Sequence, residues 1–483
     1  MKVLIFSTFH LPPHFLGLNM EFVQRSVEKG DEVYFVNCLG TFQTCGFNTY
    51  SYSYMCDICN FRTKNGHNLL PDNLNKLSLQ SLIKEGDIQT ARDFVRRHEE
   101  IGKDLKFEDF EVGEAVFSSF ISKTREQDLD GRLEILRTLT INSIQIYLSL
   151  KRFVSQESFD QLFLFNGRWD YYRAALAASR SCGLKIEIFE NFRSGGFFET
   201  YGDSLPHDIL TNKALIDKNW YKSRHNQKEK EAISREFFTK RRQGQAVFSK
   251  SFTGNQKKGL LPPELDSNKK TYILFNSSDD EFAAVGEGFK NPFFIDQKDG
   301  ILYLIEFFSN HPNLQLVIRM HPNLVGLKRG YLDPIYESKN KYNNIIIIEP
   351  QDPVDTYELM SFGYVIISFG STAGLEAAYW NKPVVLLGKC FYYYSDVAYV
   401  PRSRTEISEL LLSDLKAKGK VEAMKFAYYY QEGGKKGRFY YYKNLNKVFY
   451  NNQPLHHLPY WFKIKYKLKK WLVVFFHDNL KYL

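Results

Sequence analysis

Short apolar runs that end in polar or glycine-rich turns recur along the chain. Three of them lie between Leu316 and Gly388, in the segments LVIRMHPN, NNIIIIEP and YVIISFGSTAGLEAAYWNKPVVLLG. Segments long enough for helices separate these runs, so the pattern predicts parallel strands joined by helices. In open sheets of this kind, ligands bind outside the carboxyl ends of the strands. We therefore expect His321 and the turn from Ser368 to Thr372 to lie at one ligand-binding edge.

The first half of the chain shows the same alternation of strand-like and helix-like segments. Strand-like runs cover Lys2–Ser7, Glu32–Asn37, Gln161–Phe165 and Lys185–Phe189. They predict a Rossmann-like domain, although this segment lacks GxGxxG and no dinucleotide is implied. From about residue 71 to residue 156, apolar residues recur at helical spacing, which predicts a helical insertion in this domain.

A charged segment followed by GLLPPELD marks the predicted boundary between two domains. We expect a first Rossmann-like domain over residues 1–258, with a cysteine-rich loop over 38–59, and a second over 259–440. Residues 441–483 form a predicted tail in which lysines alternate with aromatic and aliphatic residues. Such a tail suits a helix on an anionic membrane surface, or a helix packed back onto the domains.

Composition and charge are those of a large protein with well-formed cores. The chain has 483 residues, of which 43% are hydrophobic, and a formal net charge of +9. That charge suits acidic small molecules and anionic membranes, and no nucleic-acid motif accompanies it. The start MKVLIFSTFH lacks a cleavage pattern, and no apolar run reaches the roughly 18 residues that span a bilayer. We therefore expect a cytoplasmic protein, peripheral on the inner face of the cell membrane, with no nucleic-acid partner.

The turn SFGST has the chemistry of a phosphate cradle. Hydroxyl groups, glycine flexibility and the unpaired N–H groups of the following helix all favour an anion there. A histidine at the next strand end adds a donor or a cation. The alternative is that the hydroxyls only cap the helix and the histidine only ends its strand. The residues that we expect to bind the anion or its nucleotide are Ser277, Ser278, Arg319, His321, Ser368, Gly370, Ser371, Thr372 and Glu376. Glu376 suits a ribose, or is simply a first-turn glutamate favoured by the helix dipole.

Polar residues also follow two strands of the first domain, and two of them are carboxylates. Glu190 and Asp170 are the candidate catalytic groups, because a carboxylate can take a proton from a hydroxyl or act as a nucleophile. Asp170 could instead cap a helix, and Glu190 could pair with Arg193 on the surface. Arginine and asparagine side chains would orient a sugar. The candidate substrate-binding residues are Asn166, Arg168, Arg193, His207 and His14, and the lone histidine His14 could equally be a surface residue.

Four of the six cysteines fall within one short stretch: Cys38, Cys45, Cys56 and Cys59. Disulfides are rare in a cytoplasmic protein. The four thiols therefore suggest a structural zinc site, or ordinary buried cysteines in a loop. A closed set of four ligands would leave no open position for catalysis.

The motifs RMHPN, SFGSTAGLEA and NKPVVLLG, with a tyrosine-rich loop after them, resemble the nucleotide-binding half of the capsule-polysaccharide biosynthesis glycosyltransferases. This group includes bacterial Kdo transferases and is distantly similar to bacterial sialyltransferases. The resemblance implies a GT-B fold, in which two Rossmann-like domains face each other across a cleft, with a C-terminal helix. It also implies that His321, Ser371 and Thr372 contact the donor phosphate, and that Glu190 is the catalytic group ahead of Asp170. The segment ENFRSGG departs from the acidic-glycine motif of the Kdo enzymes.

By this resemblance, the first domain takes the acceptor and the second takes a nucleotide-sugar donor. The implied reaction moves a sugar to a capsule or lipopolysaccharide acceptor, which is a glycan or a lipid-linked glycan, and needs no metal for catalysis. A CMP-linked, Kdo-like sugar is one candidate donor. The alternatives are a nucleotide-sugar epimerase, a polyol-phosphate transferase of related fold, or a non-catalytic partner in polysaccharide assembly or export.

Overall fold

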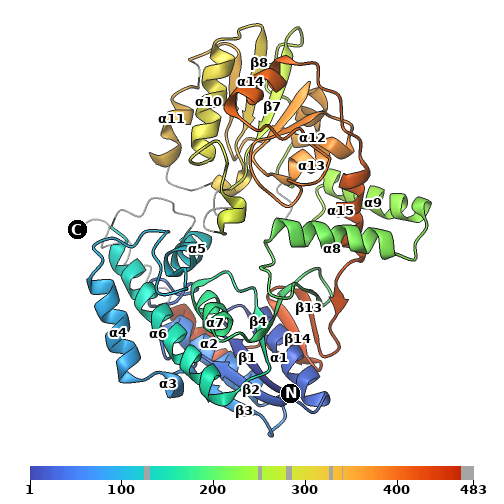
Figure 1. Ribbon diagram of the computed structural model, residues 1–483. Coiled ribbons are helices and arrows are strands. Elements are labelled where there is room, and N and C mark those ends of the chain that lie inside the picture. The colour runs from blue at the N-terminus through green and yellow to red at the C-terminus, as the bar shows by residue number, and fades with distance from the viewer. Residues whose placement is uncertain (125–130, 248–252, 279–284, 326–329, 340, 469–483) are drawn as a thin grey trace. The chain divides into compact units, whose positions relative to one another are not determined.

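The protein consists of two compact α/β units. The computed structural model describes residues 1–124, 131–247, 253–278, 285–325, 330–339 and 341–468 (Figure 1). One unit contains Met1–Pro206 and Gly434–Leu483, and the other contains His207–Gly433. Each has its own sheet with a parallel core, which confirms the predicted α/β fold with two Rossmann-like domains. Their arrangement about a cleft stays a prediction.

The sheet of the first unit has the order β12-β6-β5-β4-β1-β2-β3. Its parallel strands are β1 (Lys2–Ser7), β2 (Glu32–Asn37), β3 (Asn75–Ser78), β4 (Gln161–Phe165) and β5 (Lys185–Asn191). The antiparallel strands β6 (Phe197–Thr200) and β12 (Lys435–Lys436) extend one edge. The chain moves outward in opposite directions from β1 and β4, so the ligand-binding crevice of such a sheet opens at their carboxyl ends.

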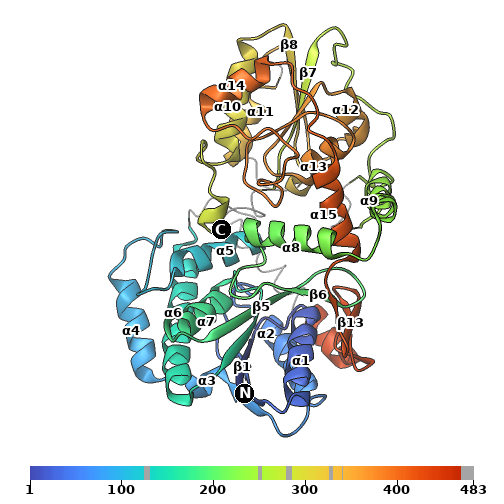
Figure 2. The ribbon, with the colours of Figure 1, turned by 45° about the vertical axis from the view of Figure 1, so that its right-hand side comes forward.

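Helices cover both faces of this sheet, with α1 and α2 on one side and α6 and α7 on the other (Figure 2). The helices of the unit are α1 (Pro13–Glu28), α2 (Ser53–His67), α3 (Leu79–Leu82), α4 (Glu85–Arg96), α5 (Val112–Thr124), α6 (Leu133–Glu157) and α7 (Asp170–Ser181). The predicted helical insertion is confirmed as α3 to α6. It also contains the edge strand β3, whose sequence NKLS is too short and polar to be recognised as a strand.

The second unit repeats the same strand order around its own core, β11-β10-β7-β8-β9. Its parallel strands are β7 (Lys270–Phe275), β8 (Leu314–Arg319), β9 (Ile345–Ile348), β10 (Val365–Ser368) and β11 (Val384–Leu386). The helices are α8 (Ile209–Lys222), α9 (Gln227–Arg242), α10 (Gln297–Ser309), α11 (Asp333–Tyr336), α12 (Thr356–Phe362), α13 (Thr372–Tyr379), α14 (Arg404–Leu412) and α15 (Val421–Glu432). Short 3-10 turns cover Glu287–Phe289, Pro322–Leu324 and Gly330–Leu332. The switch point lies between β7 and β10, so their carboxyl ends define the second candidate ligand edge.

The units divide after Pro206, not at the predicted boundary between residues 258 and 259. The charged helices α8 and α9 belong to the second unit because they pack against α15. Ser234 Oγ donates a hydrogen bond to the Met424 carbonyl at 2.9 Å, and Phe237 is buried beside it. The many lysines and glutamates of α9 cover its outer face. From the sequence alone, the segment therefore had the pattern of a solvated helix that leads to the linker between the domains.

The predicted separate tail is also wrong for its first part, because residues from Gly434 onward return to the first unit. There β13 (Tyr440–Asn444), β14 (Lys447–Tyr450) and β15 (Gln453–Pro454) form an antiparallel sheet against α1. Residues 460–468 then form a helix. The remaining tail, 469–483, lies outside the described residues. Among the described helices, none is both long and apolar enough to span a membrane.

Candidate active site

The first candidate site forms where β4 and β5 end. Phe165 lies beside Phe189 in the strand register, so the next residues, Asn166 and Glu190, reach the same level of the sheet. Asn166 adopts a left-handed conformation with φ of 59°, and its Nδ2 donates to Glu190 Oε2 at 2.5 Å. The Asn191 N–H donates to Glu190 Oε1 at 2.8 Å. The structure thus brings the predicted catalytic carboxyl group and the predicted asparagine together.

Glu190 has the electrostatics of a proton-transfer group. Burial raises its pKa to about 7, against the opposing effect of the hydrogen bonds from Asn166 and Asn191. A base works best when its pKa lies near the working pH. Perturbed carboxyl groups of this kind gather at functional sites. The guanidinium of Arg193 lies over the Phe197 ring, 3.6 Å from its centroid, which gives Arg193 a packing role at the turn after β5.

Asp170, the second catalytic candidate, is wholly buried. It is the first residue of α7 and not its cap, which is Trp169. Its Oδ2 accepts from the Gly46 N–H at 3.0 Å, and its own N–H donates to Ser119 Oγ at 2.8 Å. Burial raises its pKa to about 7. Since no part of this side chain is exposed, the structure gives Asp170 the role of joining α7 to two neighbouring segments, and a catalytic role is not supported.

Two of the predicted substrate-binding residues, Arg168 and His14, form hydrogen bonds with other residues of the protein. Arg168 is buried, and its Nε donates to Ser118 Oγ at 2.6 Å. His14 lies on α1, where its Nδ1–H donates to the Leu445 carbonyl at 3.0 Å. Burial lowers the pKa of His14 to about 4, so the ring is neutral near pH 7. His207 is the first residue of the second unit, and its predicted substrate contact stays a prediction.

The C-terminal segment contributes to this site, which was not predicted from the sequence. Tyr440 OH donates to Asn191 Oδ1 at 2.6 Å, and Tyr442 OH donates to the Arg193 carbonyl at 2.7 Å. Gly196 has φ of 84°, and a Cβ there would lie 2.5 Å from the Tyr440 carbonyl oxygen. The second glycine of FRSGG, Gly196, therefore allows the close approach of this segment. The tyrosine run at 440–442 was the only local signal of it.

The four cysteines surround one cavity of about 30 Å³, together with Phe9 and Tyr171. Burial raises the pKa of all four thiols, that of Cys59 to about 12. Zinc binds thiolates that converge on one point. Among the described residues, no three histidine, cysteine, aspartate or glutamate side chains are arranged to hold a metal ion. The geometry does not support the predicted structural zinc, and it agrees with the alternative of ordinary cysteines, with partly buried and neutral thiols at Cys38, Cys45, Cys56 and Cys59.

The second candidate site lies at the switch point of the second unit. Ser277 follows β7, and its Oγ donates to the Phe369 carbonyl after β10 at 3.4 Å. His321 follows β8, and its N–H donates to Asn276 Oδ1 at 2.7 Å. The Asn323 side chain donates to Ser278 Oγ at 3.2 Å. These contacts connect the ends of three adjacent strands, as the sequence pattern predicts for a ligand-binding edge.

The imidazole of His321 is oriented by its own loop. Its Nδ1 accepts from the Asn323 N–H at 3.1 Å, which places the proton of the neutral ring on Nε2. An Nε2–H group can donate a hydrogen bond to a phosphate oxygen. The ring therefore has the tautomer that the predicted phosphate contact requires.

The turn SFGST is shaped by glycine and by a tyrosine that the sequence analysis did not single out. Gly370 has φ of 100°, and Ser371 caps α13, with its Oγ accepting from the Ala373 N–H at 3.3 Å. Tyr392 OH donates to the Ser371 carbonyl at 2.5 Å and lies 3.2 Å from Ser368 Oγ. Ser371 therefore caps the helix, as the alternative interpretation held. The contact of Thr372 and Gly370 with a phosphate stays a prediction.

Two predicted donor-binding residues are engaged elsewhere. Arg319 is buried, and its guanidinium donates to the carbonyls of Glu349 and Asp352. Glu376 is also buried, and it accepts from Arg241 Nε at 2.9 Å and from Tyr357 OH at 2.5 Å. The arrangement does not support their predicted contacts with the donor.

Arg241 is instead the cation that the fold brings to the first turn of α13. Its Nη2 donates to Thr372 Oγ1 at 3.2 Å. Arg241 lies on the charged helix α9, about 130 residues before that turn, so no local pattern indicated it.

Comparisons with known proteins agree with the sequence motifs. Residues 252–402 match the family model described as "Capsule polysaccharide biosynthesis protein". Comparison with curated proteins gives no match. The match confirms that this part of the chain resembles the capsule polysaccharide biosynthesis group, and it contains His321 and the SFGST turn.

Solved structures with similarity to the chain include transferases and epimerases. KpsC of Thermosulfurimonas dismutans, a beta Kdo 2,4 transferase, has 15% identity and a TM-score of 0.36, over 56% of this chain and 80% of its own. Its beta Kdo 2,7 transferase counterpart has 16% identity and a TM-score of 0.33, over 57% and 80%. The UDP-GlcNAc 2-epimerase of Methanocaldococcus jannaschii, in complex with UDP-GlcNAc and UDP, has 11% identity and a TM-score of 0.28, over 88% and 98%.

Proposed function

We propose that this protein is a glycosyltransferase of capsule or lipopolysaccharide synthesis that uses a nucleotide-sugar donor. The observation that carries the proposal is the Glu190 site, where a carboxyl group with a pKa of about 7 is held by Asn166 and Asn191 at a strand end. The match of residues 252–402 to the capsule polysaccharide family model supports the donor side.

In the proposed reaction, Glu190 accepts the proton of an acceptor hydroxyl as that oxygen attacks the anomeric carbon of the donor. The bond between the sugar and the nucleotide phosphate breaks at the same centre. Donors at His321 and at the first turn of α13 stabilise the negative charge that grows on the leaving phosphate. The acceptor is a glycan or a lipid-linked glycan, and a CMP-linked, Kdo-like sugar is the first donor to test. Catalysis by this route uses no metal.

Nucleotide binding tests the donor half of the proposal. The midpoint of thermal unfolding is measured with CMP, CDP, UDP, GDP and ADP, because a ligand of the folded state raises its stability. We expect one nucleotide to raise the midpoint, and His321→Ala to abolish that shift. The control is His311→Ala, since His311 lies just before β8, at the opposite end of the strand that His321 follows.

Other outcomes identify other functions. A shift that survives in His321→Ala would contradict the phosphate role. Release of UDP from UDP-GlcNAc without an acceptor would indicate an epimerase, and transfer of a polyol phosphate would indicate that class of transferase. No shift with any nucleotide would indicate a non-catalytic partner in assembly or export.

We also propose that the protein binds the inner face of the cell membrane through the helix at residues 460–468. Phe462 packs on Phe61, and Tyr466 packs on Tyr54, with ring centroids 5.2 Å apart in each pair, so one side of the helix is fixed to α2. Trp461, Ile464 and Leu468 remain exposed. Lysines stand among them at 463, 465 and 467. Apolar side chains beside lysines suit an anionic lipid surface.

Co-sedimentation with vesicles tests this surface. We expect binding to vesicles that contain phosphatidylglycerol and little binding to pure phosphatidylcholine. The variant Trp461→Ser/Ile464→Ser should lose binding, whereas Tyr221→Ser, at an exposed aromatic residue of the second unit, should not. Equal sedimentation of all three proteins with anionic vesicles would contradict the proposal.

A further inference from the structure

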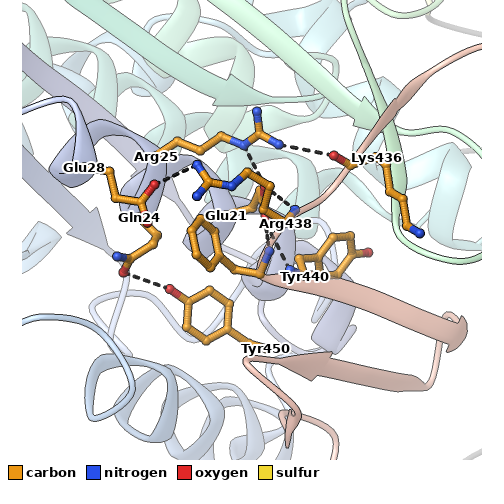
Figure 3. Close-up of polar contacts among 9 residues, drawn as sticks. Glu21, Gln24, Arg25, Glu28, Lys436, Arg438, Tyr440 and Tyr450 are labelled. Carbon is orange, nitrogen blue, oxygen red and sulfur yellow. Dashed lines mark hydrogen bonds and ion pairs between the residues drawn. The ribbon is translucent and has the colours of Figure 1, made fainter.

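One face of α1 is built to hold the C-terminal segment of the chain. His14, Gly17, Glu21 and Glu28 follow one another at helical spacing, and each meets a residue between 438 and 448. Figure 3 shows the middle and end of this face, where Glu21, Arg25 and Glu28 point at the segment around Arg438 and Tyr440. Such a run of contacts along four turns of a helix requires many compatible side chains. It therefore indicates a fixed structural element and not a loose tail.

The centre of the contact is the carboxylate of Glu21, which is fully buried. Its Oε1 accepts from the Arg438 N–H at 2.8 Å and from Arg25 Nε at 2.6 Å. Its Oε2 accepts from the N–H groups of Phe439 and Tyr440 at 2.7 and 3.0 Å. Hydrogen bonds to an ionised acceptor are about twice as strong as neutral ones. Three successive amides on one carboxylate fix the chain direction just where β13 begins.

Tyr440 is the residue that this anchor places. Its ring lies against α1 at Gly17, where an added Cβ would come within 2.7 Å of it. Its hydroxyl donates to Asn191 Oδ1 at 2.6 Å, and the Asn191 N–H in turn donates to Glu190 Oε1 at 2.8 Å. A continuous path of contacts therefore runs from Glu21 through Tyr440 and Asn191 to Glu190.

We propose that β13 is a working part of the Glu190 site, in which Glu21 fixes the strand and Tyr440 is a positioning residue that holds Asn191 and, through it, Glu190. This role rests on the proposed function, because it concerns the geometry of the proposed base. In this proposal the C-terminal segment takes part in acceptor activation. Residues of α1 and of β13, far apart in the sequence, then position one site.

The groups around Glu190 determine the expected pH effect. The titratable groups that interact with it are the hydroxyls of Tyr172, Tyr440 and Tyr442, and burial raises the pKa of each, so all are neutral near pH 7. The hydrogen bond from the Asn191 N–H lowers the pKa of Glu190. If Asn191 loses its support, this bond weakens and the pKa of Glu190 rises. The acidic limb of the activity profile should then move to higher pH.

Hydrogen exchange tests the anchor without reference to activity. In Glu21→Gln we expect faster exchange of the amides of residues 438–440, because a neutral amide replaces the charged acceptor. The matched control is Glu28→Gln, which removes only the ion pair of Glu28 with the Arg438 side chain. Unchanged exchange in Glu21→Gln, or equal acceleration in both variants, would overturn the anchoring role.

Kinetics test the positioning role. Tyr440→Phe keeps the ring and removes the hydroxyl, and Tyr450→Phe is the control, since Tyr450 OH donates to Gln24 at 3.2 Å instead. We expect Tyr440→Phe to lower kcat by roughly ten- to a hundredfold, as a misplaced catalytic group does. The acidic limb should move to higher pH, the donor KM should not change, and Tyr450→Phe should match the wild type.

The alternative outcomes separate the two proposals. Equal loss of activity in both variants with unchanged pH profiles would show that the hairpin of β13 and β14 is merely structural, and would overturn the positioning role. Wild-type rates in Tyr440→Phe would do the same. If the wild type itself transfers no sugar, the proposed function fails, while hydrogen exchange still decides whether Glu21 anchors the strand.

Discussion

At the scale of the residue, the two candidate catalytic carboxyl groups of the first unit, those of Glu190 and Asp170, have similar pKa values and different surroundings. Burial raises the pKa of both Glu190 and Asp170 to about 7. Glu190 is only partly buried and lies at the end of β5, whereas Asp170 is enclosed by Gly46 and Ser119. A pKa raised to about 7 therefore suits proton transfer at Glu190, whereas at the enclosed Asp170 it only lowers the stability of the fold.

Asp170 gives a prediction about stability and pH. Its folded pKa of about 7 lies above the usual value, so folding favours the protonated form, and ionisation penalises folding increasingly between about pH 4 and pH 7. Asp170→Asn cannot ionise and should avoid this penalty. We expect the variant to gain stability relative to the wild type as pH rises from 5 to 8, by about 2–3 kcal/mol. Urea unfolding at a series of pH values measures the gain, and a constant difference across this range would contradict it.

Residue identity alone could predict part of the site. Glu190, Asn166 and His321 were recognisable because polar residues directly after apolar runs indicate strand ends. Arg319 also ends an apolar run, and Glu376 follows the SFGST turn within α13, yet each is buried against partners from distant segments. The sequence cannot distinguish these cases, because the partner carbonyls and Arg241 are brought near only by folding.

At the scale of the element, the C-terminal hairpin of β13 and β14 explains one of the two glycines between β5 and β6. Gly195 and Gly196 have similar φ values of 87° and 84°. A Cβ on Gly196 would lie 2.5 Å from the Tyr440 carbonyl, whereas at Gly195 the nearest of these neighbours is the Phe197 ring at 3.8 Å. The two positions share backbone strain and differ in their contact with the hairpin.

This difference gives a second prediction. Gly196→Ala should destabilise the protein by about 1–3 kcal/mol more than Gly195→Ala, because only the first substitution forces the hairpin away. Both variants lose about the same amount from the positive φ. Chemical denaturation of the two single variants measures the difference. Equal destabilisation would show that the hairpin does not press on Gly196 in solution.

Most of the strands and helices could be predicted from apolar periodicity, since their signals are local. The contact of α1 with β13 could not, because Glu21 and Tyr440 are separated by 419 positions. The helices α8 and α9 were assigned to the wrong unit for the same reason. Their polar faces dominate the sequence, and the apolar residues that pack on α15 are few.

At the scale of the whole molecule, two sheets whose parallel cores have the same strand order each supply a candidate site at the carboxyl edge of their strands. In the first unit the site follows β4 and β5, and in the second it follows β7, β8 and β10. The general rule for open parallel sheets was enough to predict both edges. The units themselves divide differently from the prediction, because the chain crosses to the second unit at residue 207 and returns at residue 434.

The central claim of this account is that Glu190 accepts a proton during sugar transfer. The most direct test measures transfer from a nucleotide sugar to a capsule-type oligosaccharide by mass spectrometry, for the wild type and Glu190→Gln between pH 5 and pH 9. Glu187→Gln is the control, since Glu187 lies on the same strand and accepts a hydrogen bond from the Gly202 N–H at 3.0 Å.

We predict that wild-type activity rises with pH through about 7, as Glu190 loses its proton. Glu190→Gln should lose roughly a hundredfold or more in kcat and should lose that acidic limb, while Glu187→Gln keeps both. Transfer by Glu190→Gln at the wild-type rate, with the acidic limb intact, would contradict the account.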